Sequence, residues 1–345
     1  MSIDNILVVR NDKLGDFMLS YPALALLRAY LPEARITVLV PEYTRELALA
    51  CASVDRVLID PGPARGWQGT WALARRLRRK RFDALIALFS TGRTALAGLL
   101  AGIPYRLAPA TKAAQFLYTN RLLQRRSQSQ KPEFLYNLEL AAHFLHTQKI
   151  EVSEFPTPPF LRFDEANVGA LRKTFCDERG IEPARRLVFL HTGSGGSANN
   201  LSAAQYGVLG RALAPADGDT TLVLTAGPGE VDNAREVSRL LAEAPHVVFE
   251  STEGLKRFAQ HIQFADLFVS GSTGPLHIAG ALDVPTAAFY PRRRSATALR
   301  WQTLNTPERR LAFWPPEGVE ESDMGAIDIA AAAEQIKKRL FGREV

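Results

Sequence analysis

Two hydrophobic patterns alternate along the first half of the chain. Short apolar runs, often β-branched, occupy 6–9, 36–40, 57–59 and 84–89, and an alanine- and leucine-rich stretch with helical spacing fills 21–31. Apolar runs this short indicate buried strands, whereas the longer periodic stretch indicates a helix. Strands that alternate with helices predict βαβ units and a parallel sheet.

The same alternation resumes in the second half. Strand-like runs lie at 187–190, 221–224, 247–249, 267–269 and 286–289, with helical patterns at 205–214, 232–242, 253–262 and 275–282. The sequence therefore predicts an α/β fold of two Rossmann-like domains, with parallel sheets facing each other across a cleft. Ligands of such sheets bind at the carboxyl ends of the strands, so we expect function in the loops there.

A proline-rich segment separates the two halves. Residues 156–159 read Pro-Thr-Pro-Pro, a stiff stretch that suits neither a helix nor a central strand. We therefore expect one domain over 1–155 and a second over 156–326. An alanine-rich helical pattern then fills 327–340, so that 327–345 form a terminal helix.

Composition narrows the class of protein. The chain has 345 residues, 46% hydrophobic and 23% charged, which is ordinary for a globular protein. Its longest apolar runs stop at six or seven residues, and the N-terminus lacks the basic segment of a signal peptide. Two cysteines, Cys51 and Cys176, are too few for a disulfide framework or a structural zinc site. A reducing, cytoplasmic location is expected.

The charge is unevenly distributed. Net charge is +6, but residues 65–131 hold fourteen basic residues and one acid, so that this segment carries +13 and the rest −7. The run is either a solvated helix face or a patch for nucleic acid, an anionic membrane or a phosphorylated substrate. No nucleic-acid-binding motif accompanies it. Four aromatic residues nearby are candidates for an interface or for the core: Trp67, Trp71, Phe116 and Tyr118.

The loop after the first strand offers a candidate catalytic carboxylate. It reads Arg-Asn-Asp-Lys-Leu-Gly-Asp and ends at Asp16, where the next helix begins. The carboxylate of Asp16 would either cap that helix or act as a general base that deprotonates a sugar hydroxyl. Lys13 adds a cation to the same loop. The dinucleotide fingerprint Gly-x-Gly-x-x-Gly is absent, which disfavours a dehydrogenase.

Two loops of the second half suit an anionic ligand. Residues 191–200 contain Ser194, Gly195 and Asn199 in a run of small residues, whose backbone N–H groups and hydroxyls suit phosphate, although a flexible surface loop is the alternative. No Walker A lysine follows. Residues 270–277 join a strand to a helix whose N-terminus suits a diphosphate. The candidate donors there are Ser272, Thr273, Gly274 and His277, the last of which would otherwise be structural.

Two further residues follow strands. Glu230 would accept hydrogen bonds from ribose hydroxyls or cap the next helix. Arg300 follows the last predicted strand and would bind an anionic donor or acceptor, or lie in solvent.

The motifs, in this order and spacing, resemble the family 9 glycosyltransferases, the ADP-heptose:lipopolysaccharide heptosyltransferases and their relatives. They are the Arg-x3-Leu-Gly-Asp start, His-x-Gly-Ser-Gly-Gly-Ser and Ser-Thr-Gly-Pro-Leu-His. The resemblance implies a GT-B fold, whose terminal helix crosses back to the first domain. It also implies inverting, metal-independent transfer from ADP-L-glycero-D-manno-heptose to the Kdo or heptose of the lipopolysaccharide inner core. Asp16 would be the base. The family's diphosphate-binding positions correspond to Ser194, Gly195, Ser272, Thr273, Gly274 and His277.

Two departures from the family bear on the donor. Ser272 stands where many heptosyltransferases have aspartate, and Asn199-Asn200 stand where many have lysine. A UDP- or GDP-sugar donor with another glycan acceptor therefore stays open, as does a non-catalytic sugar-nucleotide-binding protein. We expect no metal or cofactor, with Lys13 and Arg300 supplying positive charge. The expected acceptor is an anionic, lipid-linked glycan of the lipid A–Kdo type at the inner face of the cytoplasmic membrane, and nucleic acid is not an expected partner.

Overall fold

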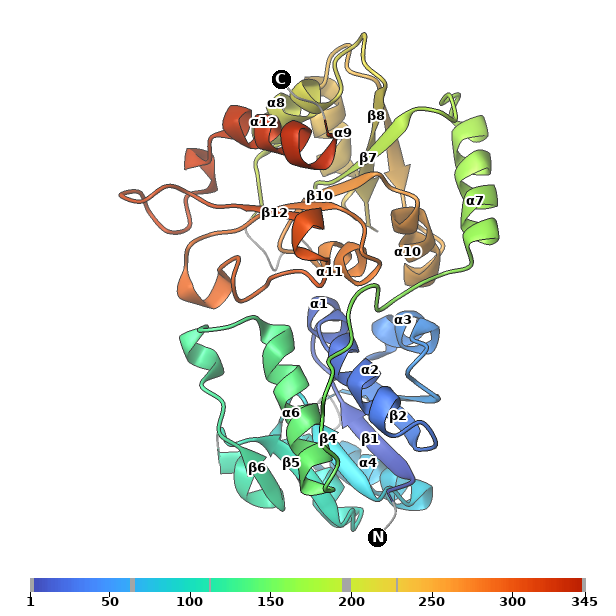
Figure 1. The fold of residues 1–345 in the computed structure, drawn as a ribbon, viewed down its shortest axis with the longest axis vertical. Coiled ribbons are helices and arrows are strands. Elements are labelled where there is room, and N and C mark those ends of the chain that lie inside the picture. The colour runs from blue at the N-terminus through green and yellow to red at the C-terminus, as the bar shows by residue number, and fades with distance from the viewer. Residues whose placement is uncertain (1–2, 63–65, 112, 194–199, 228, 343–345) are drawn as a thin grey trace. The chain divides into compact units, whose positions relative to one another are not determined.

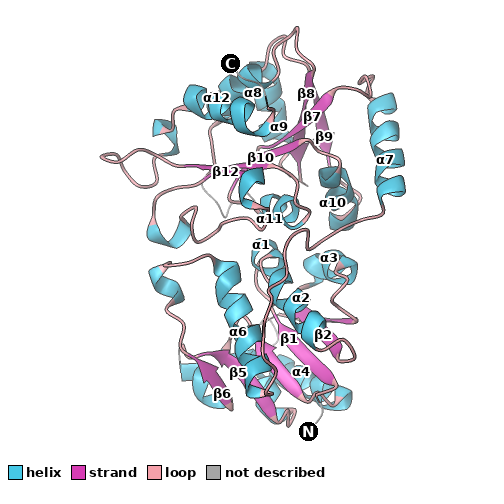
Figure 2. Ribbon diagram, viewed as in Figure 1, coloured by secondary structure: helices cyan, strands magenta, loops and turns pink. Residues whose placement is uncertain are grey.

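The computed structural model describes residues 3–62, 66–111, 113–193, 200–227 and 229–342. The chain divides into two compact units, Met1–Phe160 and Leu161–Val345, each a sheet covered by helices (Figures 1 and 2). The boundary predicted from the prolines lies a few residues earlier, between 155 and 156.

The first unit contains a six-stranded parallel sheet in the order β3-β2-β1-β4-β5-β6. Its strands are β1 Asn5–Val9, β2 Arg35–Val40, β3 Arg56–Ile59, β4 Ala84–Ala87, β5 Tyr105–Pro109 and β6 Asn120–Leu122. Val8 of β1 lies between Val38 and Ile86 in register. β4 is apolar throughout and β1 is apolar from Ile6 on, as expected for strands covered by helices on both faces.

Among the described residues of this unit, six α-helices and several 3₁₀ turns surround the sheet. They are α1 Leu14–Met18, α2 Tyr21–Tyr30, α3 Arg45–Ala50, α4 Gly66–Lys80, α5 Gly92–Leu100 and α6 Glu133–Thr147, with η1 Glu42–Thr44, η3 Ala113–Leu117 and η4 Arg126–Gln128. α4 and α5 pack on each other and on the side chains of Leu7, Val9 and Leu85, whereas α2 packs against α6.

The second unit repeats this plan in the order β12-β11-β10-β7-β8-β9. Its strands are β7 Arg186–His191, β8 Thr220–Ala226, β9 His246–Glu250, β10 Leu267–Gly271, β11 Thr286–Phe289 and β12 Arg310–Phe313. Its helices are α7 Glu165–Glu178, α8 Ala203–Leu213, α9 Val231–Leu240, α10 Leu255–Gln263, α11 Gly274–Ala281 and α12 Ile329–Leu340. Side chains of α8, α9 and α12 share one core with β7 and β8.

Short side-chain caps fix where several helices begin. Thr91, Asp164, Ser202 and Asp328 each accept a hydrogen bond from a backbone N–H in the first turn of α5, α7, α8 and α12, respectively. A cap of this kind contributes about 1 kcal/mol to stability. These four side chains therefore set the helix starts locally, independently of the packing that follows.

The terminal helix α12 groups with the second unit and packs against α8. That it crosses back to the first domain, as the resemblance implied, stays a prediction. Its apolar residues Ala332, Ala333 and Ile336 are buried in that unit's core. The alanine-rich pattern thus predicted the helix, whereas its partner depended on tertiary packing.

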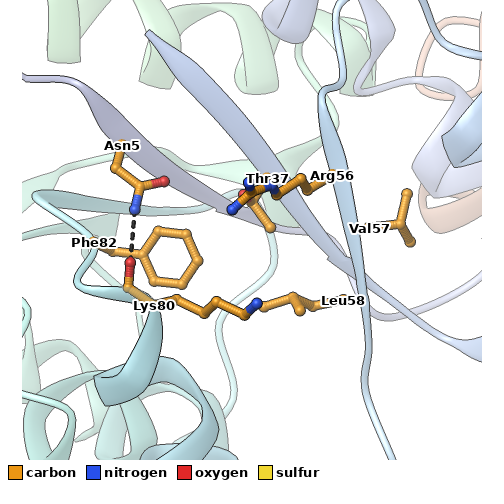
Figure 3. Close-up of a pocket in the computed structure, with 7 residues that line it drawn as sticks. All are labelled: Asn5, Thr37, Arg56, Val57, Leu58, Lys80 and Phe82. Carbon is orange, nitrogen blue, oxygen red and sulfur yellow. Dashed lines mark hydrogen bonds between the residues drawn. The ribbon is translucent and has the colours of Figure 1, made fainter.

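Each sheet has one point at which the strand order reverses, between β1 and β4 in the first unit and between β7 and β10 in the second. The loops after these strands diverge to opposite faces there, which opens a crevice at the carboxyl ends. A pocket of about 180 Å³ lies at the amino ends of β1 and β3, on the opposite edge, and its lining includes Asn5, Arg56 and Lys80 (Figure 3). Among the described residues, no helix is long and apolar enough to cross a membrane.

Candidate active site

Asp16 lies at the reversal point of the first sheet. The loop after β1 leads into α1, with Lys13 at the N-cap position and Asp16 within the first turn. The carboxylate does not cap the helix: its Oδ1 accepts a hydrogen bond from the guanidinium of Arg10. Among the described residues, none donates a hydrogen bond to its Oδ2. Lys13 is exposed. The carboxylate is therefore oriented through one oxygen, while the other is available as a proton acceptor.

Arg10 holds this carboxylate from a buried position. Its side chain is 3% exposed, its Nε donates to Asp12 Oδ1 at 2.9 Å, and its Nη1 lies 3.5 Å from Glu133 Oε1. Burial opposes the charge of Arg10, but the three neighbouring carboxylates raise its pKa above the ordinary value. Burial also raises the pKa of Asp12, to about 6, with Asp16 adding to the effect and Arg10 opposing it. A buried charge held by three carboxylates fixes their positions.

Helix α6 supplies a second layer that sequence analysis missed. Glu133 Oε1 accepts a hydrogen bond from Arg126 Nη1 at 2.7 Å, so that it serves both arginines. Asn137 Oδ1 accepts from Arg10 at 3.1 Å and from Arg126 at 3.4 Å, while its amide donates to the carbonyl of Leu19 at 3.0 Å. Glu133 and Asn137 are four residues apart, so one face of α6 presents both to Arg10. This four-residue spacing of polar side chains is the sequence signal from which the pair could have been predicted.

Asp60 joins three loops of the same edge. It follows β3 and accepts hydrogen bonds from Asn11, after β1, and from Arg93, in the first turn of α5 after β4. Its other oxygen accepts from the backbone N–H of Gly62 at 3.0 Å. Asp60 therefore links the loops at the carboxyl end of the sheet, near the candidate base. The sequence analysis did not predict these contacts.

The second unit places its first candidate loop after β7, at the other reversal point. Ser194, Gly195 and Asn199 lie outside the described residues. Asn200, the next described residue, hydrogen-bonds to the loop after β7, to α8 and to the end of β10. Its amide donates to the carbonyls of Thr192 and Gly193, each at 3.1 Å, and its Oδ1 accepts from the backbone N–H of Gly271, at 3.1 Å, and from Tyr206. Asn200 thus ties the loop after β7 to the end of β10.

Glu230 lies against the backbone of Gly193. It stands at the N-cap position of α9 but makes no side-chain cap. Its Oε2 accepts a hydrogen bond from Gly227 N at 3.3 Å, and a Cβ atom placed on Gly193 would lie 2.1 Å from that oxygen. The absence of a side chain at Gly193 therefore makes room for the carboxylate, which comes from the loop after β8.

His191, the last residue of β7, is buried behind this pair. Its Nδ1 lies 3.0 Å from the Thr225 hydroxyl. Burial lowers its pKa to about 4, although the charge of Glu230 acts in the opposite direction. The ring is therefore neutral near pH 7, and it supports the loop rather than offering a positive charge to a ligand.

The third candidate loop presents a helix N-terminus without a side-chain cap. Thr273 is the extended N-cap residue of α11, and Pro275 lies in the first turn. The Thr273 hydroxyl bonds to Ser270 Oγ at 2.8 Å instead of to the helix. Ser272 and Gly274 are half-buried on either side. The first N–H groups of a helix in this state suit an anionic group.

His277 and Arg300 both lie beside Trp301. The imidazole of His277 is 2% exposed, lies 6.4 Å from the Trp301 ring between centroids, and has a pKa lowered by burial to about 4. The guanidinium carbon of Arg300 lies 5.2 Å from the centroid of that ring. The predicted phosphate contact of His277 stays a prediction, and its burial favours a role in shaping the loop.

The candidate residues of the two units offer different chemistry. The first unit offers an oriented carboxylate, as proton acceptance requires, and the second offers backbone N–H groups and the Glu230 carboxylate, as a nucleoside diphosphate requires. No group of three or more potential metal-ligating side chains gathers within the part of the chain that the structure describes.

Comparison with known proteins identifies the family. Residues 70–306, more than half of the chain, match the model of glycosyltransferase family 9 (heptosyltransferase). A Haemophilus influenzae protein, whose name gives glycosyltransferase as an inferred activity, is 42% identical over 333 residues, covering 96% of this chain and 95% of the relative.

Solved structures agree on the fold. A family 9 glycosyltransferase from Veillonella parvula has a TM-score of 0.82 at 16% identity and covers 99% of both chains. The Escherichia coli ADP-heptose lipopolysaccharide heptosyltransferase II has a TM-score of 0.78 at 20% identity and covers 99% of this chain and 100% of its own. The chain therefore belongs to glycosyltransferase family 9, the heptosyltransferase family, and is a glycosyltransferase with the two-domain GT-B fold.

Proposed function

We propose that this glycosyltransferase moves L-glycero-D-manno-heptose from ADP-heptose to the lipopolysaccharide inner core, with inversion at the anomeric carbon and with Asp16 as general base. The observation that carries the proposal is the state of Asp16. One oxygen of its carboxylate is bound by the buried Arg10, and the other accepts no hydrogen bond from the described residues. A carboxylate held in this way, at the reversal point of a sheet, suits removal of a proton from a bound hydroxyl.

The reaction follows from these roles in one displacement. Asp16 takes the proton of the acceptor hydroxyl as its oxygen attacks the anomeric carbon from the side opposite the diphosphate. The bond between the anomeric carbon and the diphosphate oxygen breaks, and ADP leaves with the negative charge. The N-terminus of α11 and the cations Lys13 and Arg300 would stabilise that charge as it develops. The proposal includes no metal ion.

The donor would be held by the second unit. The diphosphate would bind at Ser272, Thr273 and Gly274, with Ser194, Gly195 and Asn199 of the preceding loop and with His277 nearby. Glu230 would accept hydrogen bonds from the ribose hydroxyls, since its carboxylate lies over Gly193 rather than capping α9. The E. coli heptosyltransferase II, which shares this fold, is named for ADP-heptose, and that supports the same donor here.

The acceptor would be anionic and lipid-linked, of the lipid A–Kdo type, reached at the inner face of the cytoplasmic membrane. The excess of positive charge in residues 65–131 supports an anionic acceptor. Opposite charges raise the rate of encounter with such a substrate, and the effect weakens with salt.

A second candidate is transfer from a UDP- or GDP-sugar to another glycan. Two residues favour it. Ser272 stands where many heptosyltransferases carry aspartate, and Asn199 stands where many carry lysine. A non-catalytic nucleotide-sugar-binding role is disfavoured by the oriented carboxylate of Asp16.

Turnover tests the proposal directly. The full chain is incubated with ADP-heptose and a Kdo-bearing acceptor, and ADP release and glycosylated product are measured. UDP- and GDP-sugars are run in parallel. We expect product with ADP-heptose, and loss of product in Asp16→Ala. Product from a UDP- or GDP-sugar alone would overturn the donor, and full activity of Asp16→Ala would overturn the base.

A further inference from the structure

Large apolar side chains are exposed along one layer of the first unit. Trp67 and Trp71 of α4 are 60% and 41% exposed, and their rings meet edge to face with centroids 5.6 Å apart. Phe116 in η3 is 75% exposed, and Leu123, just after β6, is 71% exposed. α4 packs on α5, and α5 packs on η3, so α5 connects the two elements that carry the first three side chains.

Helix α4 combines these aromatics with cations on its solvent face. Leu73, Ala74 and Leu77 are buried against the sheet. The opposite face carries Trp67 and Trp71, four residues apart, in its first half. Its second half carries exposed basic residues: Arg75, Arg76, Arg78, Arg79 and Lys80. The helix therefore presents an aromatic end and a cationic end on one surface.

Three arginines of α4 have no ion-pair partner among the described residues. They are Arg75, Arg78 and Arg79. The one acid of the segment, Asp83, accepts hydrogen bonds from the backbone N–H groups of Asp4 and Asn5, at 3.0 and 2.9 Å. An anionic partner would thus meet a segment of strong net positive charge.

The position of the aromatics links them to the candidate base. In a parallel sheet, every segment that follows a strand starts at the carboxyl edge. Trp67 lies in the first turn of α4, after β3, and Phe116 lies in η3, after β5. Asp16 follows β1 and so lies at this same edge. A surface bound through these side chains would be held beside the edge at which the acceptor hydroxyl must be deprotonated.

We propose that this surface docks on an anionic lipid bilayer. The α4–η3 surface comprises Trp67, Trp71, Phe116 and Leu123 with Arg75, Arg78, Arg79 and Arg121. Tryptophan and phenylalanine settle at the level of the headgroups, while arginine binds the lipid phosphates. Leu123 cannot stack on a nucleobase, and its exposure favours an apolar medium over RNA. Binding to the bilayer requires no sugar donor and does not depend on the proposed function. Only the expected gain in transfer rate on a membrane-embedded acceptor rests on that function.

Vesicle cosedimentation of the full chain tests the surface. The vesicles are phosphatidylcholine alone, or phosphatidylcholine with phosphatidylglycerol. We expect binding to the anionic vesicles only, with a blue shift of tryptophan fluorescence and weaker binding at high salt. The variant Trp67→Ser/Trp71→Ser should bind at least about tenfold more weakly, and so should Arg75→Gln/Arg78→Gln/Arg79→Gln.

The second unit provides matched controls. Trp314 is 53% exposed, and the Arg235 side chain is 60% exposed. The variants Trp314→Ser and Arg235→Gln should bind vesicles as the unaltered chain does. Equal binding by the α4 variants and the unaltered chain would overturn the proposal. So would binding of single-stranded RNA or of another protein through the same residues in preference to vesicles.

A lipid-free acceptor separates this proposal from the proposed function. The tryptophan variant should glycosylate a water-soluble acceptor at the rate of the unaltered chain, yet lose rate on a vesicle-embedded one. Vesicle binding with no heptose transfer would overturn the proposed function and leave the surface standing. Heptose transfer to the soluble acceptor without vesicle binding would overturn the docking surface and leave the proposed function standing.

Discussion

At the scale of single residues, the site depends on one buried guanidinium. Arg10 contacts Asp12, Asp16 and Glu133, and it shares Glu133 with Arg126. These ions stabilise one another as a set, because each buried ion would be costly on its own. This network explains how a carboxylate can be both oriented and partly available at the end of β1.

Asp16→Asn should abolish most transfer while leaving the fold and ADP binding intact. The amide keeps the shape but cannot accept the proton, so we expect kcat to fall by about 10²- to 10⁴-fold. Steady-state kinetics and ADP titration measure the two effects. Asp12→Asn distinguishes the neighbouring carboxylate: if that variant loses transfer and Asp16→Asn does not, the base has been assigned to the wrong residue.

Glu133→Gln should destabilise the first unit by about 3 kcal/mol, because it leaves Arg10 and Arg126 buried with less compensating charge. Glu139→Gln on the same helix is the control. Glu139 pairs with Lys131 at the surface, with 40% of its side chain exposed, so its loss should cost no more than about 1 kcal/mol. Urea unfolding compares them, and equal effects would contradict a structural role for the buried network.

His277 should make stability depend on acid pH. Its native pKa, about 4, lies below the ordinary value, so protons bind the unfolded chain first and stability falls as pH drops from about 6.5 toward 4. His277→Gln should be less stable than the unaltered chain near pH 7. That difference in stability should narrow by roughly 2–3 kcal/mol near pH 4.5. Urea unfolding at the two pH values measures it. Asp12 titrates in this range with the opposite sign, so the comparison is made between variants. A gap independent of pH would contradict a buried neutral ring.

At the scale of elements, two loops of the second unit act together. Glu230 occupies the space that a side chain at Gly193 would take. A methyl group there meets the end of a flexible side chain, so it can move the carboxylate without breaking the fold.

Gly193→Ala should weaken ADP binding about tenfold or more through displacement of Glu230, with little change in the melting temperature. Glu230→Ala should have a similar effect, and the double variant should be no worse than either single one, because both remove the same contact. Calorimetric titration with ADP measures the cycle. Fully additive losses would show that the two residues act separately.

The elements that the sequence predicted were those with a strong local signal. All nine predicted strands lie on observed ones, although β4 ends at Ala87 rather than at 89. Three strands were missed. The edge strands β6 and β12 are short and carry polar residues, and β5 begins with Tyr105 and Arg106, which interrupt the apolar pattern. Such strands form because a neighbouring strand offers hydrogen bonds, which no local pattern records.

The candidate site had local signals only in part, for the same reason. Asp16, Glu230 and the α11 turn were singled out because each follows a strand or precedes a helix within a few residues, and their roles stay predictions. Glu133 and Asn137 were missed because more than a hundred residues separate them from Arg10, and their contact exists only once α6 packs on the sheet. The packing of α12 against α8 had no local signal either, because it joins two segments that lie more than a hundred residues apart in the sequence.

At the scale of the whole molecule, two units repeat one topology and divide the chemistry. Each sheet reverses its strand order beside its first strand, and each candidate loop lies at the resulting edge. The first unit carries the proposed base and the positively charged α4–η3 surface, and the second carries the proposed nucleotide site. The central claim is that this second site is specific for ADP.

Thermal unfolding of the full chain with ADP, UDP, GDP, CMP or NAD tests that claim most directly. A ligand that binds only the folded state, at 100 times its dissociation constant, stabilises it by about 2.7 kcal/mol, which is a measurable shift. We predict stabilisation by ADP that is reduced in Glu230→Ala but retained in Asp16→Asn. Selective stabilisation by UDP or GDP, with none by ADP, would contradict an ADP-heptose donor while leaving the GT-B fold and the base unaffected.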